Sequence, residues 1–551
     1  KLWSVNEDNT VSLGRDGKVY GNIQIDGGQE SLHLFASDTL YQINIEDFQL
    51  SNLSALLENF DPDLSISGDL NISSDIRFRD KALLVNSNIL LRDFIFQDTH
   101  FGNISMEFFN NRENNINGKV LLENGKNTLR LEGTYGMNTS SSPLKAELNI
   151  NFDETEDFKS FGNALIRNPK GSIQGNVNLT GDMNHLDTNG KIDFNSFDFL
   201  LVPVNNTYSI ADESISLNEN TLIFNNFILQ DSMKNNFSIN GSVKTEKINV
   251  FSMDLSLKAD RFSVYNVSVE NNPNFYGSLL VSMDATLKGT TENPNIWLDL
   301  TIDKGTDLVY ALPPKNFDLV DSEGIVEFVN FSSPDTIQET GLEQYVGDTI
   351  FSKLNWIDLN AVVKIDRSSQ FMIDVDPISG DYIQFGGSGN LNLLVQKNQN
   401  PRITGTYEFN RGIYEVSFYG LVKKTFEFEP GSIITWSGDP YAAQLSLKAT
   451  NTIRTASVGL VAREIYGLPD EEKSKYRRSL PYTVEINIAG QVEKPEIKFG
   501  IDLPEEQRNG FPLVDSKLNQ LAQPEHESEL TRQVFGLLTI GSFIPETTGP
   551  G

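Results

Sequence analysis

The feature that most constrains the fold is a long, regular alternation of apolar and polar residues at 64–80. In LSISGDLNISSDIRFRD the even positions carry mainly apolar side chains and the odd positions carry polar ones. Because successive side chains of a β-strand point to opposite faces, this stretch predicts one strand with an oily face and a wet face. At ~3.3 Å per residue it would be roughly 50 Å long, whereas usual strands have about 5 to 6 residues. A strand of this length has a long apolar face, which another part of the chain, a partner or a ligand has to shield from water.

The same alternation recurs along the chain and predicts a mostly β fold. It is found in seven further segments, bounded by Gly, Asn, Asp or Pro: 171–181, 251–259, 278–289, 295–303, 387–394, 443–449 and 483–492. Three segments, beginning at Ser65, Gly171 and Gly277, are spaced by 106 residues. Short helices are predicted before the first two copies, at 53–60 and 158–165. We therefore predict a repeat made of a short helix and several long strands.

Two regions are predicted along the chain. Residues 1–384 form a repetitive β-groove region with the repeat of about 106 residues, and residues 385–551 form a C-terminal β-domain that ends in a helix. A turn-rich segment at 340–360 and a charged segment at 461–482 look like insertions between strands. From residue 504 onward the pattern becomes helical.

Composition excludes several classes of function. The 75 acidic and 44 basic residues give a net charge of −31, which repels nucleic-acid backbones. Cysteine is absent, and the four histidines show no metal-ligand spacing. No nucleophile motif or phosphate loop is found. We therefore expect a protein that is not an enzyme and has no cofactor or metal.

The continuous succession of strands, without polar linkers, predicts one elongated, curved sheet folded lengthwise into a U. Its inner face would form a long apolar groove, and the ligand suited to such a groove is an acyl chain whose headgroup stays in water. An aromatic stripe at 405–418 either packs on this face or stacks sugars or bases, and we favour packing. The candidate groove residues are Ile66, Leu70, Ile72, Ile76, Phe78, Ile173, Val177, Leu179, Leu279, Val281, Met283, Leu287, Tyr407 and Phe409.

The last predicted helix carries apolar residues mainly along one side. This side either contacts a partner protein or covers the last strand of the sheet, and the sequence leaves both possibilities open. The candidate partner-binding residues are Leu530, Val534, Phe535, Leu537 and Leu538.

The C-terminal third resembles the C-terminal domain of the TamB family. The resemblance rests on four motifs: Gly405, Tyr407 and Phe409 in a G-x-Y-x-F strand, the strand and turn of 431–440, an L-x-L-x-A strand at 445–449, and the strand pair around Gly490 and Pro495. Together with LTRQVFGLL at 530–538, these motifs cover roughly residues 385–545. Upstream, the repeats match the family only in style.

This resemblance implies an AsmA-like bridge in the periplasm of a Gram-negative cell, with a β-taco groove carrying phospholipid between inner and outer membranes. It also implies a TamA-like outer-membrane barrel of the Omp85 type as partner, and an inner-membrane anchor outside this fragment. Alternatives are a structural or chaperone subunit for outer-membrane protein insertion, or a closed β-solenoid interaction protein. An outer-membrane β-barrel would also use alternating strands, but regular aromatic girdles are not found.

Overall fold

The structure of the chain is a computed structural model. It describes residues 3–545 with gaps at 16, 54–64, 80–81, 97–98, 111–114, 138–143, 154–165, 183–185, 248, 312–355, 377–378, 419–421 and 493. The predicted helices at 53–60 and 158–165 lie almost entirely outside the described residues, as does most of the predicted insertion at 340–360.

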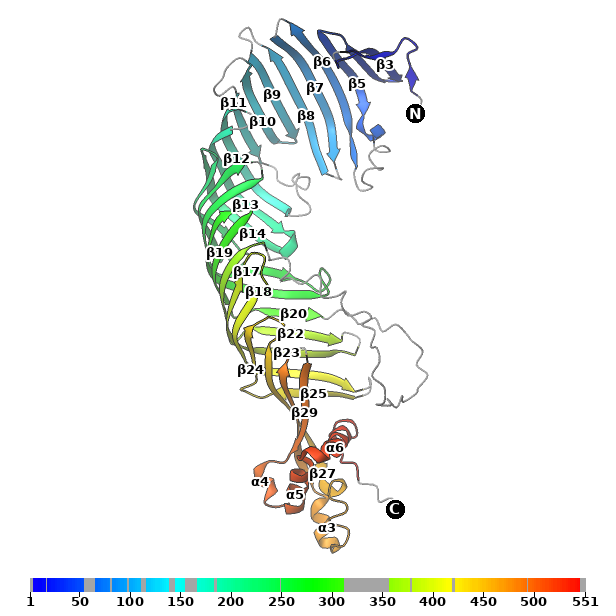
Figure 1. The fold of residues 1–551 in the computed structure, drawn as a ribbon, viewed down its shortest axis with the longest axis vertical. Helices are drawn as coiled ribbons and strands as arrows, with labels where there is room; N and C mark the ends of the chain where they lie inside the picture. Colours follow the sequence, from blue (N-terminus) through cyan, green and yellow to red (C-terminus); the bar gives the residue numbers. More distant parts are fainter. Residues whose placement is uncertain are drawn as a thin grey trace. The chain divides into compact units, whose positions relative to one another are not determined.

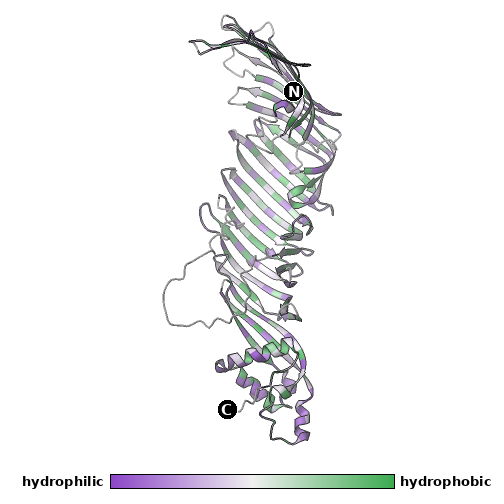
Figure 2. Cartoon of the chain, turned by 90° about the vertical axis from the view of Figure 1, so that its right-hand side faces the viewer, coloured by the Kyte–Doolittle hydropathy of each residue, from purple (hydrophilic) through white to green (hydrophobic). Residues whose placement is uncertain are grey.

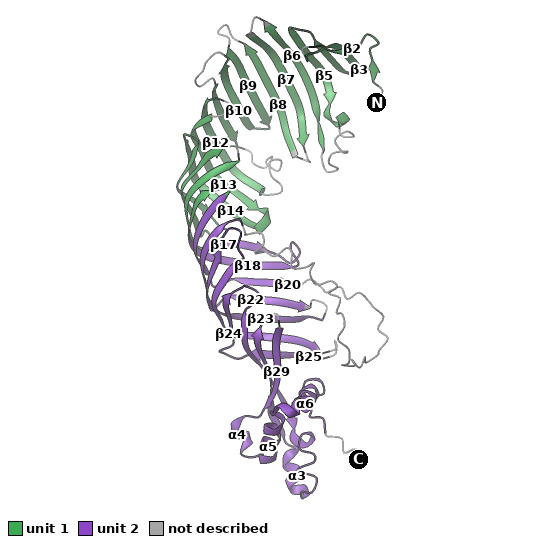
Figure 3. Cartoon of the chain, in the orientation of Figure 1, with its two compact units in different colours: residues 1–262, 286–292 green, residues 263–285, 293–551 purple. Residues whose placement is uncertain are grey.

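The predicted mostly β fold with long strands and a few short helices is confirmed. In the described part of the chain, hydrogen bonds join the strands into a 29-stranded sheet (Figure 1). The chain divides into two compact units, residues 1–262 with 286–292 and residues 263–285 with 293–551 (Figure 3). The predicted boundary at residue 385 stays a prediction.

Unit 1 is built from strands that pair antiparallel with their neighbours in chain order, after β1 and β2 both pair with β3. The segments of the predicted repeat lie in β6, β12 and β18, six strands apart. The strands are β1 (Ser4–Val5), β2 (Thr10–Leu13), β3 (Val19–Gly27), β4 (Glu30–Ala36), β5 (Leu40–Gln49), β6 (Ile66–Arg79), β7 (Ala82–Phe96), β8 (Thr99–Asn110), β9 (Asn115–Asn124), β10 (Asn127–Gly136), β11 (Leu144–Phe152), β12 (Ile166–Gly181), β13 (Leu186–Leu201), β14 (Asn206–Asn218), β15 (Thr221–Gln230), β16 (Asn236–Lys247) and the first part of β17 (Val250–Val267).

Unit 2 is a mixed sheet. β19 and β21 pair parallel, as do β20 and β22, and the strands from β22 to β29 pair antiparallel with one another. Its strands are β18 (Phe275–Thr290, in part), β19 (Asn293–Ile302), β20 (Asp307–Ala311), β21 (Asp358–Ile365), β22 (Gln370–Asp376), β23 (Asp381–Val395), β24 (Arg402–Phe418), β25 (Val422–Phe428), β26 (Ile433–Gly438), β27 (Gln444–Ala456), β28 (Ser479–Gln491) and β29 (Lys494–Asp502).

The described α-helices belong to unit 2 and gather beside its last strands (Figure 1). They are α3 (Asp470–Tyr476), α4 (Glu505–Arg508), α5 (Pro512–Leu521) and α6 (Glu527–Thr539). The predicted insertion at 461–482 contains α3 and its last residues form the start of β28, and α4 to α6 account for the helical pattern after residue 504. Among the described helices, none is long and apolar enough to cross a membrane.

Two faces of opposite character result from the alternation. Hydrophobic and hydrophilic bands alternate along the strands (Figure 2). On one face of unit 1, polar side chains form exposed ion pairs, such as Lys119 with Glu132 (3.5 Å) and Lys191 with Asp193 (2.5 Å). Exposed pairs of this kind stabilise a fold by at most about 1 kcal/mol each. The polar face is therefore mainly the solvated side of the sheet and contributes little to its stability.

Five strands of unit 1 contain a left-handed residue that is followed directly by phenylalanine, and at all of them but Arg261 the register shifts as it does at a bulge. We call these five positions the bulge pairs. The bulge residue has a φ of 47–51°, a left-handed conformation that non-glycine residues seldom adopt. A bulge inserts one extra residue and bends the strand, so apolar residues on either side of it, three apart, project to the same face. The bulge pairs are Asp47–Phe48, Asp93–Phe94, Ser196–Phe197, Asn226–Phe227 and Arg261–Phe262.

Asparagine side chains on the next strand hold three of these bulges. A bulge leaves the regular ladder, so its backbone N–H needs another acceptor. In each case the N–H donates to an asparagine Oδ1. The pairs are Asp47 with Asn71 (3.0 Å), Asp93 with Asn103 (3.0 Å) and Asn226 with Asn240 (2.7 Å).

Replacing Asn240 by Ala removes the acceptor for the Asn226 N–H, and we expect the bulge to loosen at a cost of about 1 kcal/mol. Amide hydrogen exchange in peptides covering β15 should become faster. The control is Asn218→Ala, at the exposed end of β14, which should leave exchange in β15 unchanged. Unchanged exchange in Asn240→Ala would show that the side chain does not hold the bulge.

Candidate apolar binding face

Side chains of unit 1 line up across the strands into a continuous apolar row, which we call the central row. Each member is the direct register partner of the next, and Gly190 is its only member without a side chain. At ~4.8 Å per strand the row is about 70 Å long. It comprises Val5, Ile25, Leu32, Ile45, Ile72, Ile89, Met106, Val120, Leu131, Leu148, Val177, Gly190, Leu217, Leu222, Val243 and Met253.

A second row runs beside it on the same face, two residues along each strand. Cross-strand neighbours of this kind stabilise a sheet by roughly 0.2–1 kcal/mol per pair, so the two rows also fix the register. The second row comprises Phe48, Leu70, Leu91, Ile104, Leu122, Leu129, Ile150, Gly175, Ile192, Ile215, Phe224, Gly241 and Leu255.

The apolar face over β3–β11, which we call the open section, is only half-covered. Every member of the central row from Ile25 to Leu148 is half-buried, although a core residue of the same type would ordinarily be buried. Two cavities lie on this section. One of about 250 Å³ lies against Ile23, Leu34 and Ile43, and one of about 170 Å³ lies over β8–β11.

Small residues form the floor of the second cavity. Gly118, Gly133 and Ala146 are successive register partners on β9, β10 and β11. A Cβ at Gly118 would lie 3.2 Å from the Phe108 ring, and one at Gly133 would lie 2.4 Å from the Ala146 Cβ. Tyr135 and other apolar side chains complete the lining. The glycines therefore leave room above the sheet for an apolar group.

Over β13–β17 aromatic rings cover the part of the face that lies beside the central row, while the row itself stays half-buried from Leu217 to Met253. This aromatic cluster consists of Phe194, Phe197, Phe199, Tyr208, Phe224, Phe227, Phe237 and Phe262, linked by ring contacts with centroid distances of 5.3–6.0 Å. Phe197, Phe227 and Tyr208 are only 4–6% exposed. Ile210 and Ile239 pack against the same rings. The apolar groove predicted from the sequence is thus narrowed here, because Phe197, Phe227 and Phe262 each follow a left-handed residue and add a ring to the face.

The predicted groove residues of β6 and β12 lie on this one face. Leu70 belongs to the second row, and Ile72 and Val177 belong to the central row. Leu179 pairs with Ala146 beside the small-residue floor. The remaining predicted residues of these strands, Ile66, Ile76, Phe78 and Ile173, are half-buried or, for Phe78, 48% exposed. Lipid contact by these residues stays a prediction.

Leu279, Val281, Met283 and Leu287 occupy alternate positions of β18. Val281 is 3% exposed, and the other three are half-buried. A charge at Val281 would therefore be expected to disturb folding, whereas Leu179 offers a half-buried position for the same test.

The predicted groove residues Tyr407 and Phe409 lie within the main core of unit 2. Each is 4% exposed and contacts the ring of Phe385, and the same core includes the C-terminal helices. The Tyr407 ring lies over Gly387 and Gly389, where a Cβ would come within 2.9 and 3.1 Å of it. Burial raises the pKa of Tyr407, and its hydroxyl has no hydrogen-bond partner in the described part of the chain.

The predicted partner-binding residues of α6 divide into two groups. Leu530, Val534, Leu537 and Leu538 are buried in the core of unit 2, whereas Phe535 is 42% exposed. The helix thus covers its own sheet, which is one of the two possibilities left open by the sequence. Partner binding by these five residues stays a prediction.

After α6 the chain folds back over residues 540–545, a segment that we call the C-terminal return. Its contacts hold the covering layer, which is α6 packed on the sheet, in place. Gln533, 1% exposed, donates from Nε2 to the carbonyl of Ile544 (2.7 Å) and accepts from the Ile544 N–H (2.9 Å). Phe543 packs edge-on against Tyr482 at 4.7 Å, and the Tyr482 hydroxyl lies 2.6 Å from the Ser457 hydroxyl. Burial raises the pKa of Tyr482 to about 12, so it stays protonated in this layer.

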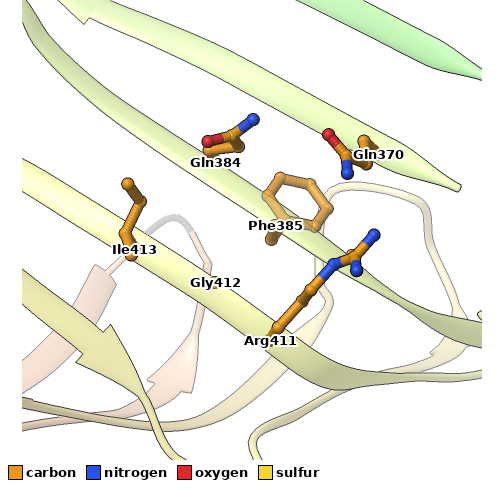
Figure 4. A pocket seen from close by; sticks show the side chains of 7 residues that line it. Gln370, Gln384, Phe385, Arg411, Gly412 and Ile413 are labelled. Atoms are coloured by element: carbon orange, nitrogen blue, oxygen red, sulfur yellow. The ribbon is translucent and has the colours of Figure 1, made fainter. Parts of the chain in front are cut away.

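Unit 2 also holds a cavity of about 270 Å³ whose lining combines polar side chains with the apolar side chains of Phe385 and Ile413 (Figure 4). Gln370, Gln384 and Arg411 border it, where Gly386 and Gly412 leave space. In the register, Gln384 pairs with Ile413, and Gly386 pairs with Arg411. This lining differs from the apolar lining of the cavities in unit 1, so we do not assign an acyl chain to it. No cluster of three or more metal-ligating side chains is found among the described residues.

The bulge phenylalanines were missed by the sequence reasoning. A signal was present, because the triplets EDF, RDF, NSF, NNF and DRF place a polar residue at the bulge position directly before Phe. Each triplet interrupts an alternating stretch and shifts its phase by one residue. A search for such phase shifts would have found all five positions.

Fold and face together define a long-sheet protein with one extended apolar face. A family model described as the TamB C-terminal domain matches residues 225–549, more than half of the chain. The chain therefore belongs to the TamB family, which assigns it to outer-membrane assembly or envelope-related transport and indicates an envelope location. The match begins well before residue 385, where the sequence motifs were recognised. No curated protein matches the chain.

Replacing Gly536 by Ala tests the C-terminal return. The added Cβ would lie 2.6 Å from the Ile544 side chain and 2.9 Å from the Ser542 carbonyl, so we expect the return to detach despite the better helix propensity of Ala. Limited proteolysis should then cleave after residue 539 more rapidly. Gly510→Ala, whose added Cβ would lie 3.4 Å from the Gln507 carbonyl oxygen, is the control. Equal cleavage in both variants would contradict the contact.

Proposed function

We propose that this chain is a non-enzymatic conduit that carries phospholipid acyl chains along its apolar face through the periplasm, between inner and outer membranes. The observation that carries the proposal is the half-buried central row over β3–β11. A monomer rarely leaves a continuous apolar surface larger than a few hundred Å² wet unless something binds there.

The size of the cavities suits hydrocarbon chains. An apolar cavity of about 150 Å³ in another protein stays dry and binds benzene, so the cavity of about 170 Å³ over β8–β11 has room for roughly six carbons of an acyl chain. Each buried methylene would add about 0.8 kcal/mol. The apolar face over β3–β11 is only half-covered, so a headgroup would remain in water while its chains occupy the face.

The mechanism needs no catalytic group. An acyl chain that slides from one strand to the next exchanges one set of aliphatic contacts for a similar set, so the barrier over the open section stays low. Transfer would follow the lipid gradient.

A partner at the C-terminal end is part of the proposal. We propose an outer-membrane barrel of the Omp85 type, TamA-like, as this partner. Support comes from Phe535, exposed on α6, and from β29, which pairs only with β28 in the described part of the sheet. An unpaired strand edge can accept a strand of another chain. The alternative function, a subunit that aids insertion of outer-membrane proteins, would use the same end.

Leu179→Asp tests the conduit directly. A carboxylate at this half-buried position would have to be dehydrated by a passing acyl chain, at a cost of several kcal/mol. We expect transfer of phospholipid between vesicles to fall at least about tenfold, with the melting temperature nearly unchanged. The matched control is Asn178→Asp, the exposed neighbour on the opposite face. Loss of folding in Leu179→Asp, or equal transfer in both variants, would contradict an open lipid-carrying face.

A further inference from the structure

We propose that the aromatic cluster is a constriction that narrows the path of an acyl chain along the apolar face of unit 1. The inference rests on the proposed function and adds to it the place where passage is slow. It assigns a role to rings that neither the alternation nor the family resemblance singled out.

Burial distinguishes this part of the face from the open section. Phe197, Phe227, Tyr208 and Phe262 are 5%, 6%, 4% and 3% exposed. Members of the central row are half-buried over β3–β11 and also over β14–β17, from Leu217 to Met253. The rings are covered by one another, so an acyl chain that passes over β13–β17 is confined to the strip along the central row unless rings rotate away.

Ring contacts between strands that are not neighbours show how the face closes. Tyr208 of β14 and Phe262 of β17 stack with centroids 5.3 Å apart and planes at 6°. Two strands, β15 and β16, lie between them in the sheet. A flat sheet would hold β14 and β17 roughly 14 Å apart. The apolar face is therefore strongly concave here, and side chains from opposite sides of the concavity meet.

A second such contact lies nearer the middle of the strands. Phe194 of β13 and Phe227 of β15 meet edge to face at 5.7 Å, across the intervening β14. Phe227 reaches this place because the bulge at Asn226 brings it to the same face as Phe224. Aromatic contacts are individually weak, so they can open for a sliding chain and close behind it.

The geometry makes Phe227 the best residue to change. Phe227→Leu keeps an apolar side chain but removes the ring that meets Phe194, and Phe227→Trp enlarges it. The control is Phe109→Leu, because Phe109 is 48% exposed and its neighbour Phe108 lies on the apolar face. A parallel preparation of each variant, used for crosslinking, has photoreactive benzoylphenylalanine in place of Leu131 in the open section.

Two quantities are measured with vesicles of phosphatidylethanolamine and phosphatidylglycerol. The first is crosslinking of phospholipid at position 131, and the second is the rate of transfer between vesicles. We expect equal crosslinking in all variants. Transfer should become roughly two- to tenfold faster in Phe227→Leu, the rate equivalent of one aromatic pair, and slower in Phe227→Trp. Phe109→Leu should behave like the unchanged protein.

Several results would overturn the constriction. One is an equal transfer rate in all variants. Another is slower transfer in both Phe227→Leu and Phe227→Trp, because this result would mean that the Phe227 ring only stabilises a core. If the unchanged protein neither crosslinks lipid at 131 nor transfers it, the proposed conduit itself fails. Crosslinking and transfer in the unchanged protein, with no effect at Phe227, would remove the constriction and leave the conduit standing.

Discussion

Cross-strand contact between aliphatic side chains on one face is the interaction on which the rest of this structure depends. In unit 1, Ile72 touches its register partners Ile45 and Ile89, and the same relation continues strand after strand. Each pair contributes little to the free energy of folding, but together the rows fix the register of the strands. A slip by one residue would turn every apolar side chain to the polar, solvent-exposed face. No second sheet is needed to define the fold, and so the apolar face over β3–β11 remains half-covered.

Bulges convert this regular sheet into one with distinct sections. A left-handed residue before phenylalanine bends the strand and adds a ring to the apolar face. Where three such strands lie close together, at β13, β15 and β17, the rings meet and cover the part of the face beside the central row. Where they are absent, at β9 and β11, Gly118 and Ala146 leave a cavity instead. The same sheet thereby provides both an open surface and a filled one, and in unit 2 the helix α6 covers the apolar face with Leu537 and Leu538.

Period-2 alternation was sufficient to predict the mostly β fold and the face on which Ile72, Val177 and Leu179 lie. Helical periodicity likewise predicted α6. The alternation could not show which apolar positions stay accessible, because burial depends on the curvature of the sheet. Tyr407 and Val281 were grouped with Leu70 for this reason, although both are buried. Curvature was encoded in the phase shifts before Phe197, Phe227 and Phe262, and in Gly387, whose space the Tyr407 ring fills.

The central claim is that hydrocarbon chains occupy the half-covered apolar face. Native mass spectrometry of the chain purified without detergent, followed by extraction and identification of bound lipid, tests it most directly. The account predicts several phospholipid molecules per chain, which exchange when the protein is mixed with vesicles of a different lipid. A folded chain that carries no lipid, before or after contact with vesicles, would contradict the account and favour a purely structural role for the sheet.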